Sequence, residues 1–172
     1  KYRDVDGNGL IDSKDQVMIS KTAGMPRIQY GFGVNIDWKR FNFGVFFNGS
    51  AMRDIDINGL HPFGQNDYNA MKFVAENRWT EANPNPNAEY PRLGLNDSQM
   101  SNNSQSSTYW IRNGNFLRFK TLEIGYRFDH VRLSFTGNNL AVFSPFKLWD
   151  PELGWNSYPL QRTFCIGAQL SF

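Results

Sequence analysis

The sequence of 172 residues lacks the long apolar run that a membrane-spanning helix requires. Such a helix needs about 18 or more consecutive apolar residues, so a segment that crosses a bilayer here must be a β-strand. Cysteine occurs once, at Cys165, which excludes an intramolecular disulfide. Histidine occurs twice, at His61 and His130, and no nucleophile and base stand in a pattern around either. The sequence therefore predicts no catalytic site.

Aromatic residues are abundant in this otherwise polar chain. They make up 16% of the residues, with 15 Phe, 7 Tyr and 5 Trp, while the mean hydropathy is −0.54. This combination is typical of outer-membrane barrels, which carry aromatic girdles at both membrane interfaces and polar residues in the lumen and loops. A soluble β-sandwich can have the same composition. The formal net charge of +2 gives no indication of a nucleic-acid partner.

Apolar residues alternate with small or polar residues in five segments, which predicts five β-strands. The clearest segment is the last, 162–172, where Phe164, Ile166 and Leu170 share one face. The other four segments cover residues 28–36, 41–49, 116–128 and 131–138. In the third of the five the alternation shifts by one residue near Lys120, which predicts a β-bulge. Because lipid-facing and lumen-facing residues alternate in membrane barrels, the fold class predicted is an all-β, transmembrane antiparallel barrel fragment.

Short and long connections alternate between the predicted strands. Residues 37–40 and 129–130 form short connections, whereas 50–115 and 140–161 form long ones. Membrane barrels have short periplasmic turns and long extracellular loops, so the carboxy terminus is expected in the periplasm. Five strands cannot close a barrel of at least eight, and we expect other polypeptide to complete it. We likewise expect the missing export signal to reflect truncation or processing.

The long connections carry a helical pattern and three tryptophans of interest. Apolar residues recur at helical spacing over about 67–79, which predicts a short helix there. Trp110, Trp149 and Trp155 are candidate substrate-binding residues, because exposed aromatic side chains commonly hold carbohydrate and peptide. The alternative is that these rings pack the loops against one another and against the barrel rim.

Residues 4–15 follow the spacing of an EF-hand-type calcium loop. The predicted ligands are Asp4, Asp6, Asn8, the backbone carbonyl of Leu10, Asp12 and Asp15. A regulatory EF-hand ends in Glu where Asp15 stands here, and no flanking pair of amphipathic helices is visible. The loop is therefore predicted to hold a structural Ca²⁺. The alternative is an acidic loop whose carboxylates are satisfied by its own backbone in a series of Asx-turns.

Short motifs follow one another in order along nearly the whole chain. They occupy residues 2–12, 26, 30–32, 77–80, 90–92, 109–120, 125–126, 137–140, 150–152, 158–159 and 172. Together they resemble the carboxy-terminal barrel region of the SusC/RagA family of TonB-linked (TonB-dependent) outer-membrane transporters. The resemblance implies that the chain supplies the last five strands of a 22-stranded barrel that an amino-terminal plug blocks. It also implies a SusD-like surface lipoprotein as a lid and TonB-energised import of glycans or peptides. Because the plug and most of the barrel lie outside this sequence, import is expected only of the parent assembly.

The predicted organisation follows the strands. It comprises a loop with the calcium motif (1–27), a hairpin (28–50), a long extracellular loop with a short helix (51–115), a second hairpin (116–139), a further extracellular loop (140–161) and the terminal strand (162–172). Phe172 and Leu170 are the predicted assembly signal for the barrel assembly machinery.

The predicted function is nutrient uptake across the bacterial outer membrane. The expected partners are the remainder of the barrel and plug, the SusD-like lipoprotein, TonB, membrane lipid, and a glycan or peptide substrate, without nucleic acid. The first alternative is a soluble calcium-dependent binding module, because the loop at residues 4–15 also resembles a dockerin repeat. The second alternative, an outer-membrane barrel enzyme, lacks a set of catalytic residues.

Overall fold

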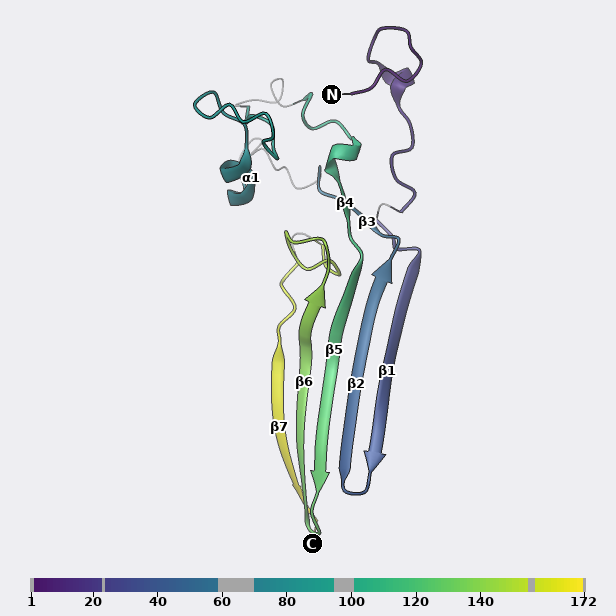
Figure 1. The fold of residues 1–172 in the computed structure, drawn as a ribbon, viewed down its shortest axis with the longest axis vertical. Helices are drawn as coiled ribbons and strands as arrows, with labels where there is room; N and C mark the ends of the chain where they lie inside the picture. The colour runs from purple at the N-terminus through teal and green to yellow at the C-terminus, as the bar shows by residue number, and fades with distance from the viewer. Residues whose placement is uncertain (1, 23, 59–69, 95–100, 155–156, 172) are drawn as a thin grey trace. The chain divides into compact units, whose positions relative to one another are not determined.

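The computed structural model describes residues 2–22, 24–58, 70–94, 101–154 and 157–171 (Figure 1). The chain divides into two compact units. The first comprises Lys1–Lys21 and Asp56–Arg112, and the second comprises Thr22–Ile55 and Asn113–Phe172. Within the described residues, the helices are too short and too polar to cross a membrane.

The second unit is built on a five-stranded antiparallel sheet in the order β1-β2-β5-β6-β7 (Figure 1). Its strands are β1 (Ile28–Trp38), β2 (Phe41–Ala51), β5 (Phe116–Arg127), β6 (Val131–Phe143) and β7 (Thr163–Leu170). These are the five strands predicted from the alternation, so the all-β antiparallel fold class is confirmed. The sheet is open, with β1 and β7 at its edges. The last predicted residue of the terminal strand, Phe172, lies outside the described residues.

One face of this sheet is apolar across all five strands. The register places apolar residues side by side in rows, of which one consists of Ile36, Phe43, Ile124, Phe135 and Ile166. Several of these apolar side chains are about half exposed or more, because none of the described residues of the unit covers this face. The alternation in each strand is thus converted by the register into one continuous apolar surface.

A β-bulge at Lys120 keeps this surface continuous. The register between β5 and β6 shifts between Phe119 and Thr121, and the pairing of β5 with β2 shifts at the same level. The extra residue returns Phe119 to the face that carries Leu122, although their sequence parities differ. The ring of Phe119 stacks on Phe47 with the centroids 4.8 Å apart. The predicted bulge is confirmed, and it keeps the apolar residues of β5 on the apolar face of the sheet.

The two connections at one end of the sheet are tight turns. Lys39 has a φ of 55°, and the turn from β1 to β2 consists of Lys39 and Arg40, which is shorter than the predicted 37–40. Arg40 Nη2 lies 2.6 Å from Asp129 Oδ1 in the turn between β5 and β6. At the other end, β6 passes through an irregularity at Asn139, which has a left-handed φ of 52°. It extends to Phe143 instead of the predicted 138, because Ala141, Val142 and Phe143 still pair with β5.

The first unit has a small core and little regular structure. Its fully buried apolar side chains are Ile57, Val74, Tyr90 and Trp110. Helix α1 spans Lys72–Asn77 and is shorter than the predicted 67–79, of which 67–69 lie outside the described residues.

The chain leaves α1 because the residues that follow the helix pair elsewhere. Arg78 forms a β-bridge with Tyr90, and the amide of Trp79 donates to the carbonyl of Tyr90 at 2.9 Å. Two short strands, β3 (Asp54–Asp56) and β4 (Ile111–Asn113), form a separate two-stranded sheet.

Candidate functional site

The face of the sheet opposite the apolar one carries small and polar side chains. Phe46 is a large exception, and glycines on β1 make room for its ring. A Cβ atom added at Gly31 would lie 3.0 Å from Phe46 Cζ, and one added at Gly33 would lie 3.1 Å from Phe46 Cδ2. The ring thus lies flat over backbone, as close approach to glycine permits. We call this surface the polar face.

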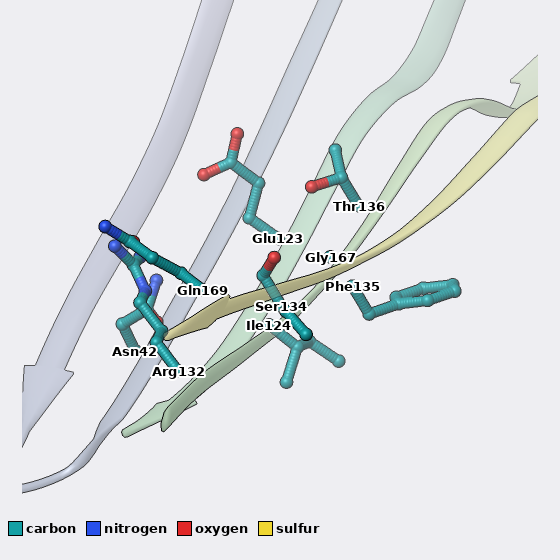
Figure 2. Close-up of a pocket in the computed structure, with 10 residues that line it drawn as sticks. Asn42, Glu123, Ile124, Arg132, Ser134, Phe135, Thr136, Gly167 and Gln169 are labelled. Atoms are coloured by element: carbon teal, nitrogen blue, oxygen red, sulfur yellow. The ribbon is translucent and has the colours of Figure 1, made fainter. Parts of the chain in front are cut away.

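Polar residues from four neighbouring strands surround a cavity of about 320 Å³ on the polar face (Figure 2). Its polar lining residues are Asn42 of β2, Glu123 of β5, Arg132, Ser134 and Thr136 of β6, and Gln169 of β7. The side chains of Glu123 and Arg132 are exposed, and neither makes an ion pair within the described part of the chain. This cavity, which we call the Glu123 cavity, offers both charges and several hydrogen-bonding groups to a solute.

A second cavity of about 440 Å³ lies at the opposite end of β1 and β2. Gln29, Asn48, Ser50, Arg53 and Glu152 contribute its polar lining. Three buried atoms of this lining, Asn48 Oδ1, Ser50 Oγ and Arg53 Nε, have no hydrogen-bond partner among the described residues. Burial lowers the pKa of Arg53, while the nearby carboxylate of Glu152 opposes that shift. Polar side chains therefore line this face at both ends of β1 and β2.

Arg118 fixes the loop after β6 to the polar face. Its side chain is only 4% exposed, and its Nη2 lies 2.5 Å from Asp150 Oδ1 while its Nε lies 3.0 Å from Glu152 Oε2. Asp150 also accepts a hydrogen bond from the amide of Glu152 at 3.0 Å. Sequence reasoning missed this network. Arg118 shares the face of Asn48, its partner in the β2–β5 register, and a buried arginine needs carboxylates, but the sequence does not show which carboxylates it reaches.

The predicted substrate-binding tryptophans are in different environments. Trp110 is 1% exposed in the core of the first unit, so its ring is not presented to a ligand there. The burial of Trp110 agrees with the alternative that these rings pack loop residues together. Trp149 is half-buried and meets Phe146 edge to face, with the centroids 4.5 Å apart. Trp155 lies outside the described residues. Of the predicted assembly signal, Leu170 is 63% exposed at the end of β7.

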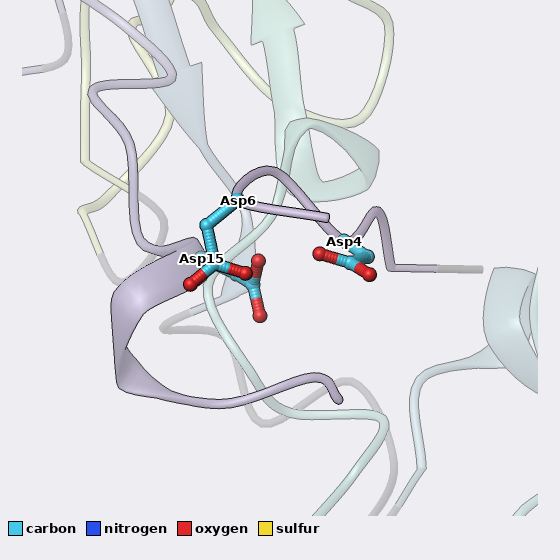
Figure 3. Close-up of side chains that lie close together, drawn as sticks. All are labelled: Asp4, Asp6 and Asp15. Carbon is cyan, nitrogen blue, oxygen red and sulfur yellow. The ribbon is translucent and has the colours of Figure 1, made fainter. Parts of the chain in front are cut away.

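The predicted calcium loop brings three of its carboxylates together (Figure 3). One carboxylate oxygen from each of Asp4, Asp6 and Asp15 lies within 4.8 Å of the others. Asp12 is outside this cluster and instead caps the 3-10 helix Ser13–Asp15, accepting from the amide of Lys14 at 2.7 Å. The structure therefore assembles part of the predicted ligand set.

Backbone amides hold the carboxylates of this loop in place. Asp4 accepts from the amides of Gly7 at 2.6 Å and Gly9 at 2.8 Å, and both glycines have a positive φ. Asp15 accepts from the amides of Asp12 and Val5, and these hydrogen bonds lower the pKa of its carboxyl group. The Asx-turns of the alternative interpretation are present as well, because Asp6 accepts from the amide of Asn8 at 3.1 Å and Asn8 accepts from the amide of Leu10 at 2.7 Å.

The Asx-turns and a bound cation are compatible. Three oxygen-bearing groups in a small loop match the hard ligands that Ca²⁺ prefers. Carboxylates this close to one another also repel unless a cation lies between them.

Comparison with known proteins finds relatives along the whole chain. The chain is 29% identical to TonB-dependent receptor P26 of Formosa agariphila, over 100% of this chain and 19% of that protein. It is 28% identical to TonB-dependent receptor SusC of Bacteroides thetaiotaomicron, over 99% of this chain and 17% of that protein. No family model matches. The chain spans about a fifth of the length of these relatives.

Solved structures show the same fold. The structure of the RagAB peptide transporter superposes with a TM-score of 0.69 at 24% identity, over 95% of this chain and 19% of that one. The closed-closed state of the RagAB peptide importer gives a TM-score of 0.64 at 25% identity, over 96% of this chain and 20% of that one. The predicted resemblance is confirmed. These relatives are receptors and transporters, in agreement with the prediction that the chain is not an enzyme.

Proposed function

Because the chain resembles TonB-dependent receptors of the SusC/RagA kind from end to end, we propose that it forms part of the wall of an outer-membrane importer. Its five strands face lipid on the apolar side and a hydrophilic lumen on the polar side. The loops of 50–115 and 140–161 contribute to the external substrate cavity and to the interface with a SusD-like lipoprotein. Oligosaccharides or peptides are the proposed substrates, and TonB acts through the remainder of the parent protein.

The single observation that carries this proposal is the continuous apolar face. Phe32 is 55% exposed on β1 and Ile166 is 87% exposed on β7, at opposite edges of the sheet. A surface of this size exposed to water would promote aggregation, whereas in lipid it needs no cover. The opposite face carries the charged side chains Glu123 and Arg132, which lipid does not tolerate.

The strand lengths support the same environment. Strands β1 and β2 each have 11 residues, which corresponds to a length of about 36 Å. At a tilt of about 40° such a strand rises about 28 Å along the membrane normal, close to the ~25 Å apolar band of outer-membrane barrels.

Depth-dependent quenching in the full-length receptor tests the facing directly. The background receptor has Cys165 replaced by Ser and any cysteines elsewhere in the receptor removed. A single cysteine is then introduced at Ile124 or at its neighbour Glu123. This cysteine is labelled with an environment-sensitive fluorophore in each variant. We expect nitroxide-bearing lipids to quench the label at Ile124 and to leave the label at Glu123 bright. Equal quenching at the two positions would contradict the proposed wall. A detergent-free monodisperse receptor would support the soluble binding module instead.

We propose in addition that the loop at residues 4–15 holds a structural Ca²⁺, with Asp4, Asp6 and Asp15 as carboxylate ligands. Support comes from their convergence within 4.8 Å. The ion would neutralise the cluster and fix the loop.

Metal analysis of the dialysed full-length receptor tests the ion. We expect Asp4→Asn with Asp6→Asn to remove one equivalent of calcium, while Asp56→Asn, an acidic change outside the cluster, leaves the content unchanged. An unchanged content in the double variant would eliminate these ligands.

A further inference from the structure

The apolar face ends in a group of aromatic side chains beside the tight turns. Trp38, Phe41 and Tyr126 are neighbours in the register of β1, β2 and β5, and Phe128 meets Tyr126 edge to face with the centroids 4.8 Å apart. All four side chains are exposed, and Trp38 is 65% exposed. Figure 1 shows the turns that follow these residues at one end of the sheet. Tryptophan and tyrosine concentrate where a membrane meets water, because each has an apolar body and a polar tip. We call these four residues the aromatic rim.

Lys39 places a cation at the aromatic rim. Its Nζ lies 5.1 Å from the centroid of the Trp38 ring, and Trp38 belongs to the apolar face. The ammonium group therefore lies on the lipid side of the turn. The other residue of this turn, Arg40, is already paired, because its Nη2 lies 2.6 Å from Asp129 Oδ1. Lys39 is thus the cation that the turn presents at the boundary between hydrocarbon and water.

The backbone at Lys39 is one that lysine rarely adopts. Its φ of 55° is left-handed, and two-residue hairpin turns favour glycine, asparagine or aspartate at such a position. Lysine therefore stabilises the turn less than these residues would. Residues held in unfavourable backbone conformations cluster at functional sites, which points to a role for the Lys39 side chain itself.

Polypeptide outside this chain leaves the aromatic rim open to lipid. The chain spans about a fifth of the length of its relatives, and β1 has a free edge to which a further strand can pair. Such a strand lies beside β1 in the plane of the sheet, so it extends the apolar face sideways and does not cover it. The exposure of Trp38 and Lys39 to lipid is therefore a property of the complete wall as well.

The chemistry of the membrane at this depth is that of lipid phosphate. A lysine ammonium group is a compact cation that donates charge-assisted hydrogen bonds to phosphate oxygens, and anionic lipid surfaces attract such groups. The Trp38 ring holds the ammonium group in place through a cation–π contact. Short turns of membrane barrels lie on the periplasmic side, where the leaflet consists of glycerophospholipid.

We propose that Lys39 binds the phosphate group of a glycerophospholipid in the periplasmic leaflet. Trp38 positions the ammonium group, and Phe41 packs against the upper part of the acyl chains. This inference rests on the proposed importer wall, to which it adds a lipid site, and it fixes the depth at which the sheet enters the periplasm.

Photo-cross-linking of the full-length receptor in a phosphate-free maltoside detergent tests the site. The probe is phosphatidylglycerol with a photoreactive group on its headgroup, and mass spectrometry of the digested receptor locates the label. We expect residues 38–41 of the wild type to be labelled. Lys39→Asn should lower this labelling about fivefold at subsaturating probe, which is the contribution of one lysine near an anionic lipid surface. Asparagine suits the left-handed position, so the turn is kept. Lys39→Arg should retain the labelling.

Matched controls separate the phosphate from the rest of the lipid and from folding. Diacylglycerol with the same photoreactive group lacks the phosphate and should label residues 38–41 about fivefold less. Lys147→Asn removes an exposed lysine of the loop after β6 and should be labelled like wild type. Heat-modifiable gel mobility confirms that each variant forms the barrel, and if Lys39→Asn fails to fold, the comparison of the two probes on wild type decides.

A separate measurement identifies the leaflet. His130 is exposed in the turn between β5 and β6, and His130→Cys in the receptor without other cysteines is treated in intact cells with a maleimide too large to cross the outer membrane. We expect no labelling of this cysteine. Labelling would place the turns on the cell surface, where lipid A supplies the phosphate, and would overturn the periplasmic site.

Three results of the cross-linking would also overturn the lipid site. They are an unlabelled 38–41 segment in wild type, undiminished labelling of Lys39→Asn, and equal labelling by the probes with and without phosphate. Failure of the importer wall itself is distinguishable, because lipid quenching at Ile124 reports the facing of the sheet whether or not Lys39 binds phosphate.

Discussion

Replacing Ile166 with arginine should impair barrel assembly, because this side chain faces lipid. Ile166 lies near the middle of β7 on the apolar face, opposite Phe135 of β6, and is 87% exposed. Since so little of the side chain is buried against the other strands of this chain, the substitution removes few contacts with them. Its cost therefore comes from placing a cation in hydrocarbon.

The magnitude follows from the depth of Ile166. Arginine on the lipid face near the bilayer midplane costs about 2–4 kcal/mol, and tenfold in the equilibrium corresponds to about 1.4 kcal/mol, so the folding equilibrium should fall by about 30- to 700-fold. The matched control is Cys165→Arg, which lies one residue away at nearly the same depth but on the polar face. Its cost should stay within about 0.5 kcal/mol, as for an ordinary exposed position.

The assay is urea titration of the full-length receptor folded into lipid vesicles, read by heat-modifiable gel mobility. The midpoint for Ile166→Arg should shift strongly relative to wild type, and that for Cys165→Arg should barely move. Equal shifts for the two variants, or a larger shift for Cys165→Arg, would refute the assignment of the two faces.

Three further changes test the internal design of the sheet. Deleting Lys120 should prevent formation of the heat-modifiable species, because Phe119 would then face the lumen, whereas Lys120→Ala should assemble normally. Gly31→Ala should cost about 0.5–1 kcal/mol in urea titration, because its Cβ would lie 3.0 Å from Phe46 Cζ, the far end of an exposed ring. Double-mutant analysis should show a smaller cost in the Phe46→Ala background; full additivity would exclude the contact. Arg118→Leu should lower the free energy of unfolding by about 3–5 kcal/mol, because it leaves two carboxylates unpaired. Limited proteolysis should then cleave the loop of 144–154 faster than in wild type. An unchanged cleavage rate would contradict this pairing.

Local pattern was sufficient to predict the strands but not their exact ends. The period of two marks which residues share a face, and the phase shift near Lys120 revealed the bulge because apolar residues must all face one way. The end of β6 was placed too early, since Gly137, Asn138 and Asn139 have the composition of a turn. The predicted strand ended at Asn138, whereas in the structure Ala141, Val142 and Phe143 resume pairing with β5 beyond the left-handed Asn139.

Contacts between distant segments were beyond sequence reasoning. The pairing of Arg118 with Asp150 and Glu152 joins residues more than 30 positions apart, and neither local spacing nor composition specifies which carboxylates an arginine reaches. The same holds for Trp110, where sequence shows an aromatic residue in a loop but only packing decides that the ring is buried.

The sequence by itself determined that this chain is β-structure with one apolar and one polar face, because side chains alternate by covalent geometry along any extended strand. It also predicted where a calcium loop can form, because the predicted ligands lie within twelve consecutive residues. Only the tertiary structure decided which polar residues meet across strands. The opposition of Arg127 and Arg132 and the separation of Glu123 from Arg132 depend on register. Register is set by the match between the apolar patterns of neighbouring strands and by the turns that join them, and not by either strand alone.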